Sequence, residues 1–562
     1  MRMNLNYCRM VKKIFLTGLI LLLGVSICDA KKRVVRKRKK RYSLQDSLRG
    51  GISEERICYD VYFYDLTVDF NLKDSSIVGS NEIAFNVLKA TSKIQLDLFK
   101  NLSVDSVLFN GDALNYTRVG NAFFVNFPTE LKQGAAEKVK VFYHGNPVIA
   151  KKAPWDGGFV WSEDKKGRPF VGVACEGLGA SSWWPNKDHL SDKPDSMRLN
   201  FIVPKGLDCV ANGVKVFSKP HKNDISKTHF QWKVQYPIVN YNVTFYLGNF
   251  ETITDYYVSE DDTLVLSYHV LDYNVEKATK HFEQVKPMLK IYEELYGKYP
   301  FWKDGYKLVD APYLGMEHQS AIAYGNQYKT GYLGRQMEGV DFDYVIIHES
   351  GHEYWGNSIT MKDLADMWIH EAFCTYTEAL YVEKRYDYET MVEYIKHGSL
   401  TISNDKAIIP AHHVNQKGSN DMYLKGAMML HVVREQLGED SLWFATLKNM
   451  HSDFAFKSVG TKEVLQYLKI HLGAKVVPIF EHYLNMTALP VLAVQKMKNK
   501  YEYMIQWYGV SPGFHMSVAF ETKNGSELIE VGDSAKRFMF EKIKSKEPKV
   551  INSVGAFTLR YR

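Results

Sequence analysis

The sequence predicts a multi-domain α+β protein with a β domain first, a helical domain second and a small β domain last. From about residue 55 the hydrophobic residues recur at every second position, which is typical of half-buried strands. This strand period is clear in Leu66, Val68, Phe70 and Leu72. Near residue 274 the spacing changes to three or four, which is typical of helices, and after Pro490 the period of two returns. The expected domains are 55–260, 261–488 and 489–562.

The first domain is expected to be mostly antiparallel, because short alternating runs are separated by turn signals. Asn110-Gly111 is one of them, and Asn-Gly between alternating runs is a strong hairpin signal. In the second domain a helical pattern runs from Val275 to Leu295. We expect a kink at Pro287 and an end at Gly297, because proline lacks an amide hydrogen and glycine favours helix ends.

The N-terminal 54 residues are expected to lie outside the folded domains. Residues 1–30 resemble a secretory signal peptide, with Lys12 and Lys13 before an apolar stretch. Residues 31–54 are expected to be a basic, disordered segment. The predicted location is therefore the periplasm, the cell surface or the medium. The alternative is an uncleaved membrane anchor, and any membrane association is expected through this segment only.

The net charge of +7 comes from the N-terminus, because residues 31–41 alone contain nine lysines and arginines. The chain from Tyr42 onward is mildly acidic, which gives no support to nucleic-acid binding. Four cysteines follow Ala30, and they are too sparse for a disulfide scaffold. A single bridge, for example between Cys175 and Cys209, stays open at this stage.

One stretch of the second domain predicts a zinc site. His348 and His352 lie four positions apart, so on a helix they project from one face and can share one Zn²⁺. Glu349 lies beside them as a candidate general base. Glu371 supplies a third ligand, and a set of three protein ligands leaves a position open, as in catalytic zinc sites. Glu378, seven residues further on, can accept a hydrogen bond from a ligating imidazole.

The spacing His348-Glu349-x-x-His352 to Glu371 resembles the aminopeptidase N family of gluzincin zinc metallopeptidases. The resemblance covers roughly residues 55–562. It implies an N-terminal β saddle, a thermolysin-like, mainly helical zinc domain and a small C-terminal β-sandwich. Family members often add a large helical domain at the C-terminus. We expect this chain to lack it and its active site to be more open.

Three further segments resemble motifs of that family. Leu314-Gly315-Met316-Glu317-His318 resembles the GxMEN motif, with Leu and His as departures, and implies that Gly315, Met316 and Glu317 bind substrate. Ala174-Cys175-Glu176 resembles a Gln-x-Glu segment, in which only Glu176 is kept. Tyr423-Leu424-Lys425-Gly426-Ala427 resembles the segment that supplies a catalytic tyrosine, here Tyr423.

The resemblance implies a zinc aminopeptidase that acts on peptides with a free N-terminus and holds one Zn²⁺ per chain. Glu349 would be the general base, Tyr423 would stabilise the oxyanion, and Glu317 and Glu176 would bind the α-amine. The alternatives are a zinc endopeptidase, hydrolysis of a lipid epoxide, and a non-catalytic surface binding protein. The sequence defines neither the oligomeric state nor the natural peptide.

Overall fold

The computed structural model describes residues 42–260, 262–499, 501–522, 525–540, 548–552 and 554–561. The expected signal peptide at 1–30 and the basic run at 31–41 lie outside these residues. No helix among the described residues combines the length and the hydrophobicity that crossing a lipid bilayer requires.

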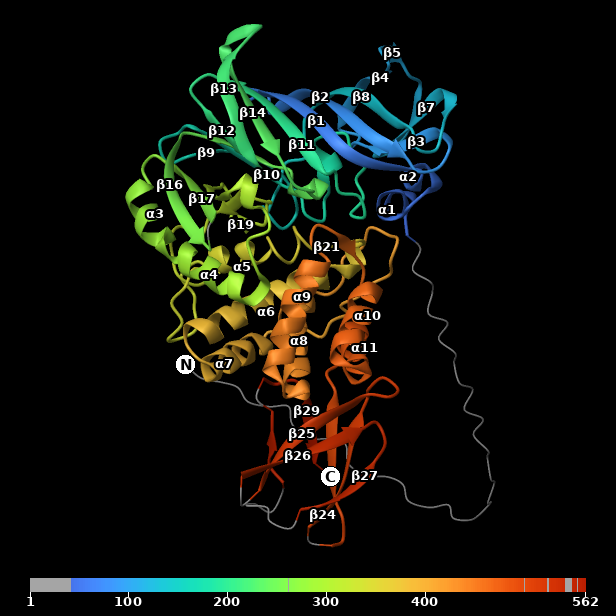
Figure 1. The fold of residues 1–562 in the computed structure, drawn as a ribbon, viewed down its shortest axis with the longest axis vertical. Helices are drawn as coiled ribbons and strands as arrows, with labels where there is room; N and C mark the ends of the chain where they lie inside the picture. Colours follow the sequence, from blue (N-terminus) through green and yellow to red (C-terminus); the bar gives the residue numbers. More distant parts are fainter. Residues whose placement is uncertain are drawn as a thin grey trace, which may run out of the picture. The chain divides into compact units, whose positions relative to one another are not determined.

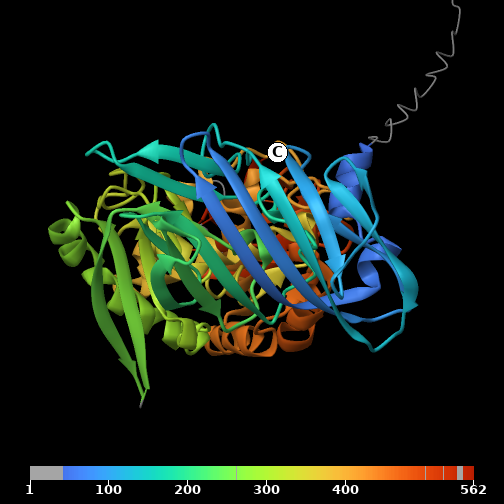
Figure 2. The ribbon, with the colours of Figure 1, turned by 90° about the horizontal axis from the view of Figure 1, so that it is seen from above.

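The N-terminal β domain is built on an eight-stranded sheet, whose long strands run side by side in Figure 2. Its strands are β1 (Tyr59–Asn71), β2 (Ser76–Val87), β4 (Leu102–Phe109), β5 (Asp112–Ala113), β8 (Ala136–Gly145), β11 (Ser196–Pro204), β13 (Val214–His221) and β14 (Asp224–Val234). Their order is β13-β14-β11-β1-β2-β8-β4-β5. Only β1 and β11 pair in parallel, so the expected antiparallel character is confirmed. The predicted turn at Asn110-Gly111 is also confirmed, because Phe109 pairs with Asp112 and both turn residues have positive φ.

Two smaller sheets complete this domain. One has four strands, β9 (Gly158–Glu163), β10 (Pro169–Ala174), β12 (Asp208–Ala211) and β15 (Phe245–Gly248), and the other has three, β3 (Thr91–Asp97), β6 (Tyr116–Val119) and β7 (Ala122–Leu131). Alternate side chains of the strands point inward into one hydrophobic core. Trp183, Trp184 and Phe245 lie at its centre, fully buried.

The expectation of disorder through residue 54 is wrong for residues 42–54. Helices α1 (Leu44–Gly50) and α2 (Glu54–Ile57) form there. A capping box between Ser43 and Asp46 satisfies the first free amides of α1. The segment is also anchored from outside, since the Asn415 N–H donates to the Asp46 carbonyl at 3.0 Å. Buried Arg56 pairs with Asp97 at 2.6 Å. These contacts hold the segment although its sequence follows a basic run.

The second domain begins earlier than residue 261. Strands β16 (Phe250–Ser259) and β17 (Asp262–Leu271) stand on either side of the predicted boundary. Both strands belong to a five-stranded sheet with β18 (Tyr306–Asp310), β20 (Ile322–Tyr324) and β19 (Gly315–Met316), in the order β16-β17-β18-β20-β19. The domain boundary therefore moves to the residues between β15 and β16.

Nine helices follow among the described residues, and Figure 1 shows them in the half of the ribbon coloured yellow-green to orange. Their bounds are α3 (Val275–His281), α4 (Val285–Tyr296), α5 (Tyr344–Gly351), α6 (Trp368–Arg385), α7 (Tyr388–Ser399), α8 (Leu424–Leu437), α9 (Asp440–Asp453), α10 (Thr461–Leu472) and α11 (Val477–Asn485). The expected end at Gly297 is confirmed. The expected kink at Pro287 is corrected: the break is a 3₁₀ turn at 282–284, and Pro287 sits in the first turn of α4, where a missing amide hydrogen costs nothing.

The C-terminal β domain consists of two sheets. One contains β23 (Val491–Lys496), β24 (Glu502–Tyr508), β27 (Lys536–Met539) and β29 (Thr558–Tyr561), and the other β25 (His515–Thr522), β26 (Gly525–Gly532) and β28 (Val550–Ile551). The Trp507 indole N–H donates to the Met516 carbonyl at 3.2 Å across the two sheets. Their buried residues form one hydrophobic core with those of the helices.

Asp343 fixes the start of α5, and we expect its loss to destabilise the protein. Its carboxylate accepts hydrogen bonds from two backbone N–H groups of the first turn, from the Tyr324 hydroxyl and from the Asn326 amide. His281 lies 2.7 Å away. Asp343→Ala should lower the free energy of unfolding by at least about 2 kcal/mol, because a cap is lost and buried donors are left unpaired. Urea unfolding measures this cost. Asp343→Asn, which can still cap, should cost less, and an unchanged midpoint for Ala would contradict the prediction.

Candidate active site

The two predicted zinc histidines lie at the C-terminal end of α5. His348 is in its last turn and His352 directly follows the helix, so the four-residue spacing puts both rings on one side. The apolar residues Val345, Ile346 and Ile347 are buried and anchor α5 in the core. Glu371 lies in the first turn of α6, which packs against α5. All three ligand candidates are buried.

The distances among these three residues fit one zinc ion. The Nε2 atoms of His348 and His352 are 3.2 Å apart, and Oε2 of Glu371 lies 3.7 and 3.5 Å from them. Ligand atoms held about 2.0–2.1 Å from a tetrahedral zinc are separated by roughly 3.3–3.4 Å. Oε2 of Glu371 is buried and has no hydrogen-bond partner among the described residues, which is costly unless a cation binds there. The set therefore fits one Zn²⁺.

Hydrogen bonds from outside the set hold the two imidazoles in the orientation that zinc requires. Nδ1 of His348 lies 2.7 Å from Oε1 of Glu378, and Nδ1 of His352 lies 3.0 Å from the Trp355 carbonyl. Each Nδ1–H donates a hydrogen bond to its acceptor, so each Nε2 directs a lone pair toward the metal position. The Tyr394 hydroxyl donates to the other oxygen of Glu378 at 2.6 Å. Glu378 thus lies where its spacing predicted.

Glu349 lies beside the ligand set without belonging to it. Burial raises the pKa of its carboxyl to about 7, and the nearby His348 and His352 act in the opposite direction. Gly315 explains how the carboxylate fits, because a Cβ at Gly315 would come within 2.8 Å of Glu349 Oε1. Strand β19 can therefore pass this close to α5 only with glycine at that position.

The predicted amine-binding residues come from two domains. Glu317 follows β19 and is buried, and the Tyr241 hydroxyl donates to its Oε1 at 3.0 Å. The Glu317 carboxylate lies close to the Glu349 carboxylate and to the His352 ring. Glu176 follows β10 in the N-terminal domain. Burial, together with the negative charge of Glu317, raises the pKa of Glu176 well above its ordinary value.

Not every predicted site residue faces this cluster. Met316 is only 4% exposed and packs in the core of the N-terminal domain, so the structure does not bring it into an open binding pocket. His318, which stands where the motif has Asn, is fully buried, and its Nδ1 lies 2.7 Å from the Tyr246 hydroxyl. Burial lowers the pKa of His318 to about 3, so it is neutral. Cys175 and Cys209 are both free and buried.

Tyr423 lies just before α8. Its hydroxyl donates to Oε1 of Glu371 at 2.6 Å. Its ring stacks on that of His348, with centroids 6.2 Å apart. The hydroxyl is therefore next to the metal position.

The arrangement joins a Lewis-acid position, a carboxylate with a pKa near neutrality and a tyrosine hydroxyl donor, which is suited to hydrolysis of a carbonyl compound. Sequence reasoning missed Tyr241, Tyr344 and Tyr394, which support Glu317, His348 and Glu378. The Tyr344 ring stacks on His348 at 5.2 Å. Each is one of 36 tyrosines, and no local pattern marks them.

Comparison with known proteins agrees with this geometry. Residues 280–483 match the Peptidase family M1 domain. The chain is 21% identical over 528 residues to the tricorn protease-interacting factor F2 of Thermoplasma acidophilum, which covers 89% of this chain and 62% of that protein. It is 21% identical over 523 residues to a probable aminopeptidase 1 of Saccharolobus solfataricus, covering 89% and 63%. The chain thus spans about three-fifths of the length of these two relatives.

Solved structures show the same fold. An M1 zinc metallopeptidase from Deinococcus radiodurans superimposes with a TM-score of 0.66 at 20% sequence identity, over 77% of this chain and 95% of that chain. A mutant described with a bound Tyr-Ser-Ala substrate gives the same TM-score. At this identity the likeness concerns the fold. Residues 280–483 thus carry a Peptidase family M1 domain, and the shared fold and the His348, His352 and Glu371 set agree with that match.

Proposed function

We propose that the protein is a zinc aminopeptidase, which removes N-terminal residues from peptides. The observation that carries this proposal is the placement of two carboxylates, Glu317 and Glu176, beside one zinc set. Two acids at a fixed distance from the metal position can hold an α-ammonium by charge-assisted hydrogen bonds. With the α-ammonium held there, the first peptide bond of the substrate lies at the metal position and is the bond that is cut.

The remaining residues supply the chemistry. Zinc, when bound, polarises the scissile carbonyl and lowers the pKa of water. Glu349 takes a proton from the attacking water and passes it to the leaving amine, a role for which a pKa near the working pH is well suited. Tyr423 donates its hydroxyl hydrogen to the oxygen that becomes negative. Its hydroxyl needs only to turn from Glu371 toward the substrate.

Two relatives support this proposal. One is described as a probable aminopeptidase, and the Deinococcus structure is described with a tripeptide substrate. The direct test is incubation of purified protein with a panel of aminoacyl-naphthylamides, with and without a chelator, followed by added Zn²⁺. We expect release that the chelator abolishes and Zn²⁺ restores. No zinc-dependent release from any member would leave a non-catalytic binding protein as the better interpretation.

Glu317→Ala should lower kcat/KM for aminoacyl-naphthylamides by about tenfold to a hundredfold, because a hydrogen bond to a charged group is worth about 1.5–3 kcal/mol. Glu317→Gln, which keeps the shape and can still accept a hydrogen bond, should lose less. The control substrate is an N-acetylated peptide, which neither the wild type nor the variants should cut. Efficient cleavage of the blocked peptide that survives Glu317→Ala would instead indicate a zinc endopeptidase.

Export is a further part of this proposal. Residues 1–30 have the composition of a signal peptide, which would place the enzyme outside the cytoplasm. N-terminal sequencing of the mature protein after cell fractionation tests it. A cytoplasmic protein that keeps its first residue would contradict it.

A further inference from the structure

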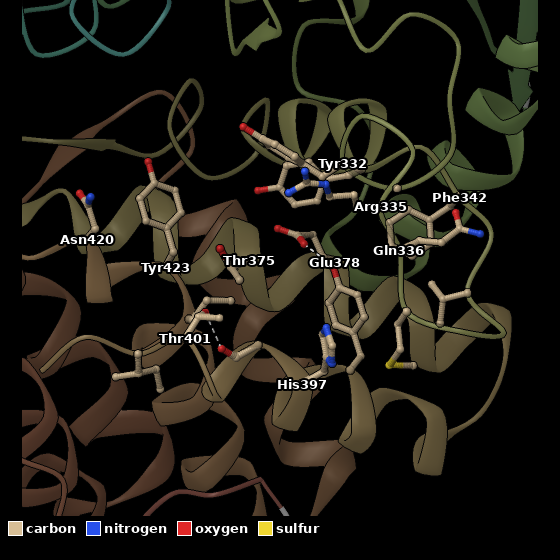
Figure 3. Close-up of a pocket in the computed structure, with 18 of the residues that line it drawn as sticks. Tyr332, Arg335, Gln336, Phe342, Thr375, Glu378, His397, Thr401, Asn420 and Tyr423 are labelled. Atoms are coloured by element: carbon tan, nitrogen blue, oxygen red, sulfur yellow. Dashed lines mark hydrogen bonds between the residues drawn. The ribbon is translucent and has the colours of Figure 1, made fainter. Parts of the chain in front are cut away.

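A cavity of about 520 Å³ opens next to the zinc set (Figure 3), within the size range of small-molecule sites. Its walls combine aromatic and aliphatic side chains with polar ones. The apolar side chains are those of Tyr332, Met337, Val340, Phe342, Tyr344, Tyr394, Ile402 and Leu424. Tyr423, Glu378 and Thr375 close the cavity toward the metal position.

The cavity lies on the leaving side of the bond that the proposed reaction would cut. It shares Tyr423 and Glu378 with the site, whereas Glu317, Glu176 and Glu349 are not among its walls. A peptide whose amine is held by Glu317 and Glu176 must extend past the metal position in the other direction. The residues after the scissile bond would then enter this cavity.

Two carboxylates on the cavity wall already have partners for both oxygens. Glu378 accepts hydrogen bonds from His348 and Tyr394. Asp421 accepts from two backbone N–H groups, those of Ser403 and Asn404. Among the residues that the structure describes, neither acid forms an ion pair with a lysine or an arginine.

Arg335 is an exposed arginine on the wall of this cavity. Its side chain lines the cavity and points from its loop toward the middle of it (Figure 3). Among the residues that the structure describes, Arg335 has neither an ion pair nor a side-chain hydrogen bond. An unpaired guanidinium in a concave, largely apolar site has five N–H donors available for a carboxylate, which it can bind through two parallel hydrogen bonds.

The loop that carries Arg335 is tied to the zinc helix. Asn326, fully buried, donates to the Gly331 carbonyl at 2.9 Å and to Asp343 at 2.8 Å, and its own oxygen accepts from the Leu333 N–H at 2.8 Å. Asp343 is the N-cap of α5. The turn is closed by the bond from the Tyr332 N–H to the Arg335 carbonyl at 2.8 Å.

Aromatic contacts extend this link to a zinc ligand. The Tyr332 ring packs edge-on against Tyr344 with centroids 5.6 Å apart, and Tyr344 stacks on His348 at 5.2 Å. The loop backbone that carries Arg335 is therefore positioned relative to the zinc ligands before any substrate binds. Such preorganisation lowers the entropic cost of binding.

We propose that Arg335 binds a carboxylate of the leaving part of the substrate, so that the enzyme prefers short peptides that present an acid there. This inference rests on the proposed aminopeptidase function. The carboxylate has two sources: the C-terminus of a dipeptide or tripeptide, or an acidic side chain after the cleaved bond. The apolar walls favour a large hydrophobic residue beside it.

The test compares kcat/KM for Leu-Phe-Ala, its C-terminal amide, and the amide of Leu-Glu-Ala, with leucyl-naphthylamide as a substrate that carries no carboxylate. In the wild type we expect at least one acid-bearing peptide to exceed the Leu-Phe-Ala amide by about tenfold to a hundredfold. Arg335→Ala should bring that ratio to within about twofold of unity and leave leucyl-naphthylamide turnover unchanged. Arg335→Lys should keep part of the preference, since it keeps the charge without the paired donors.

Lys329→Ala is the matched control, because Lys329 is an exposed cation on the same loop that does not line the cavity. It should preserve the ratio. A preference for the free acid over its amide would identify the C-terminus as the source, and a preference for the Glu amide would identify the side chain. No preference in the wild type, a ratio that survives Arg335→Ala, or an equal loss in Lys329→Ala would overturn the inference. Absence of leucyl-naphthylamide turnover would instead count against the proposed function.

Discussion

Glu349→Gln is expected to lower kcat by about 10²–10⁴-fold while the protein keeps its zinc, because an amide cannot accept and return the proton of the attacking water. Glutamine has nearly the same volume, so it fits the space that Gly315 leaves beside α5. Glu349 is not one of the three ligand candidates, so metal affinity should change little. Steady-state kinetics on an aminoacyl-naphthylamide and metal analysis of the same preparation measure both quantities.

The pH profile provides the control for this prediction. The base must be ionised, and burial raises the pKa of Glu349 to about 7. Wild-type kcat/KM should therefore be highest above this pKa and fall as the pH drops through it, by about tenfold per unit at the low end. Bound Zn²⁺ favours the carboxylate, so the midpoint should lie at or below pH 7. The residual activity of Glu349→Gln should not show this fall of kcat/KM on the acidic side. A variant with near-normal kcat, or with the same acidic limb, would exclude Glu349 as the base.

Spacing alone predicts the inner part of the site, because its members are neighbours on helices. His348 and His352 share a face through their four-residue separation, and Glu371 and Glu378 do so through seven. Each pair lies on one face of its own helix as that periodicity requires, and the packing of α6 against α5 brings the two pairs together. Helical geometry is local, so it can be deduced from a short stretch of sequence.

The residues that support the site could not be predicted, because their contacts join distant parts of the chain. Tyr241 bonds to Glu317 across 76 positions, and Tyr394 reaches Glu378 from the next helix. Arg335 lies in a turn whose shape depends on the buried Asn326 side chain. A tyrosine or an arginine in a loop has no local signature that distinguishes it from an ordinary surface residue.

The fold shows the same division between local and distant causes. The strand and helix periods predict the order of the domains, whereas the break at 282–284 and the ordered segment 42–54 depend on packing. Residues 42–54 follow a strongly basic run, which suggested disorder, but α1 is held through Asp46 and Gln45 by partners far along the chain. The capping box at Ser43 was the one local signal for this helix.

Tyr423→Phe is expected to lower kcat by about 10²–10³-fold with little change in KM, because it removes one donor that acts on the oxygen when it becomes negative. The ring that stacks on His348 is kept, so the change removes only the hydroxyl and its 2.6 Å bond to Glu371.

That bond allows a second role for Tyr423, in which the hydroxyl only positions the ligand carboxylate. The two roles separate in the metal affinity. If the hydroxyl acts on the substrate, Tyr423→Phe should bind Zn²⁺ about as tightly as the wild type, and kcat should stay low at saturating metal. If it acts through Glu371, zinc affinity should fall by about tenfold to a hundredfold and added Zn²⁺ should restore activity. Activity measured across a zinc titration therefore decides between a catalytic and a positioning residue, because only the positioning role predicts recovery.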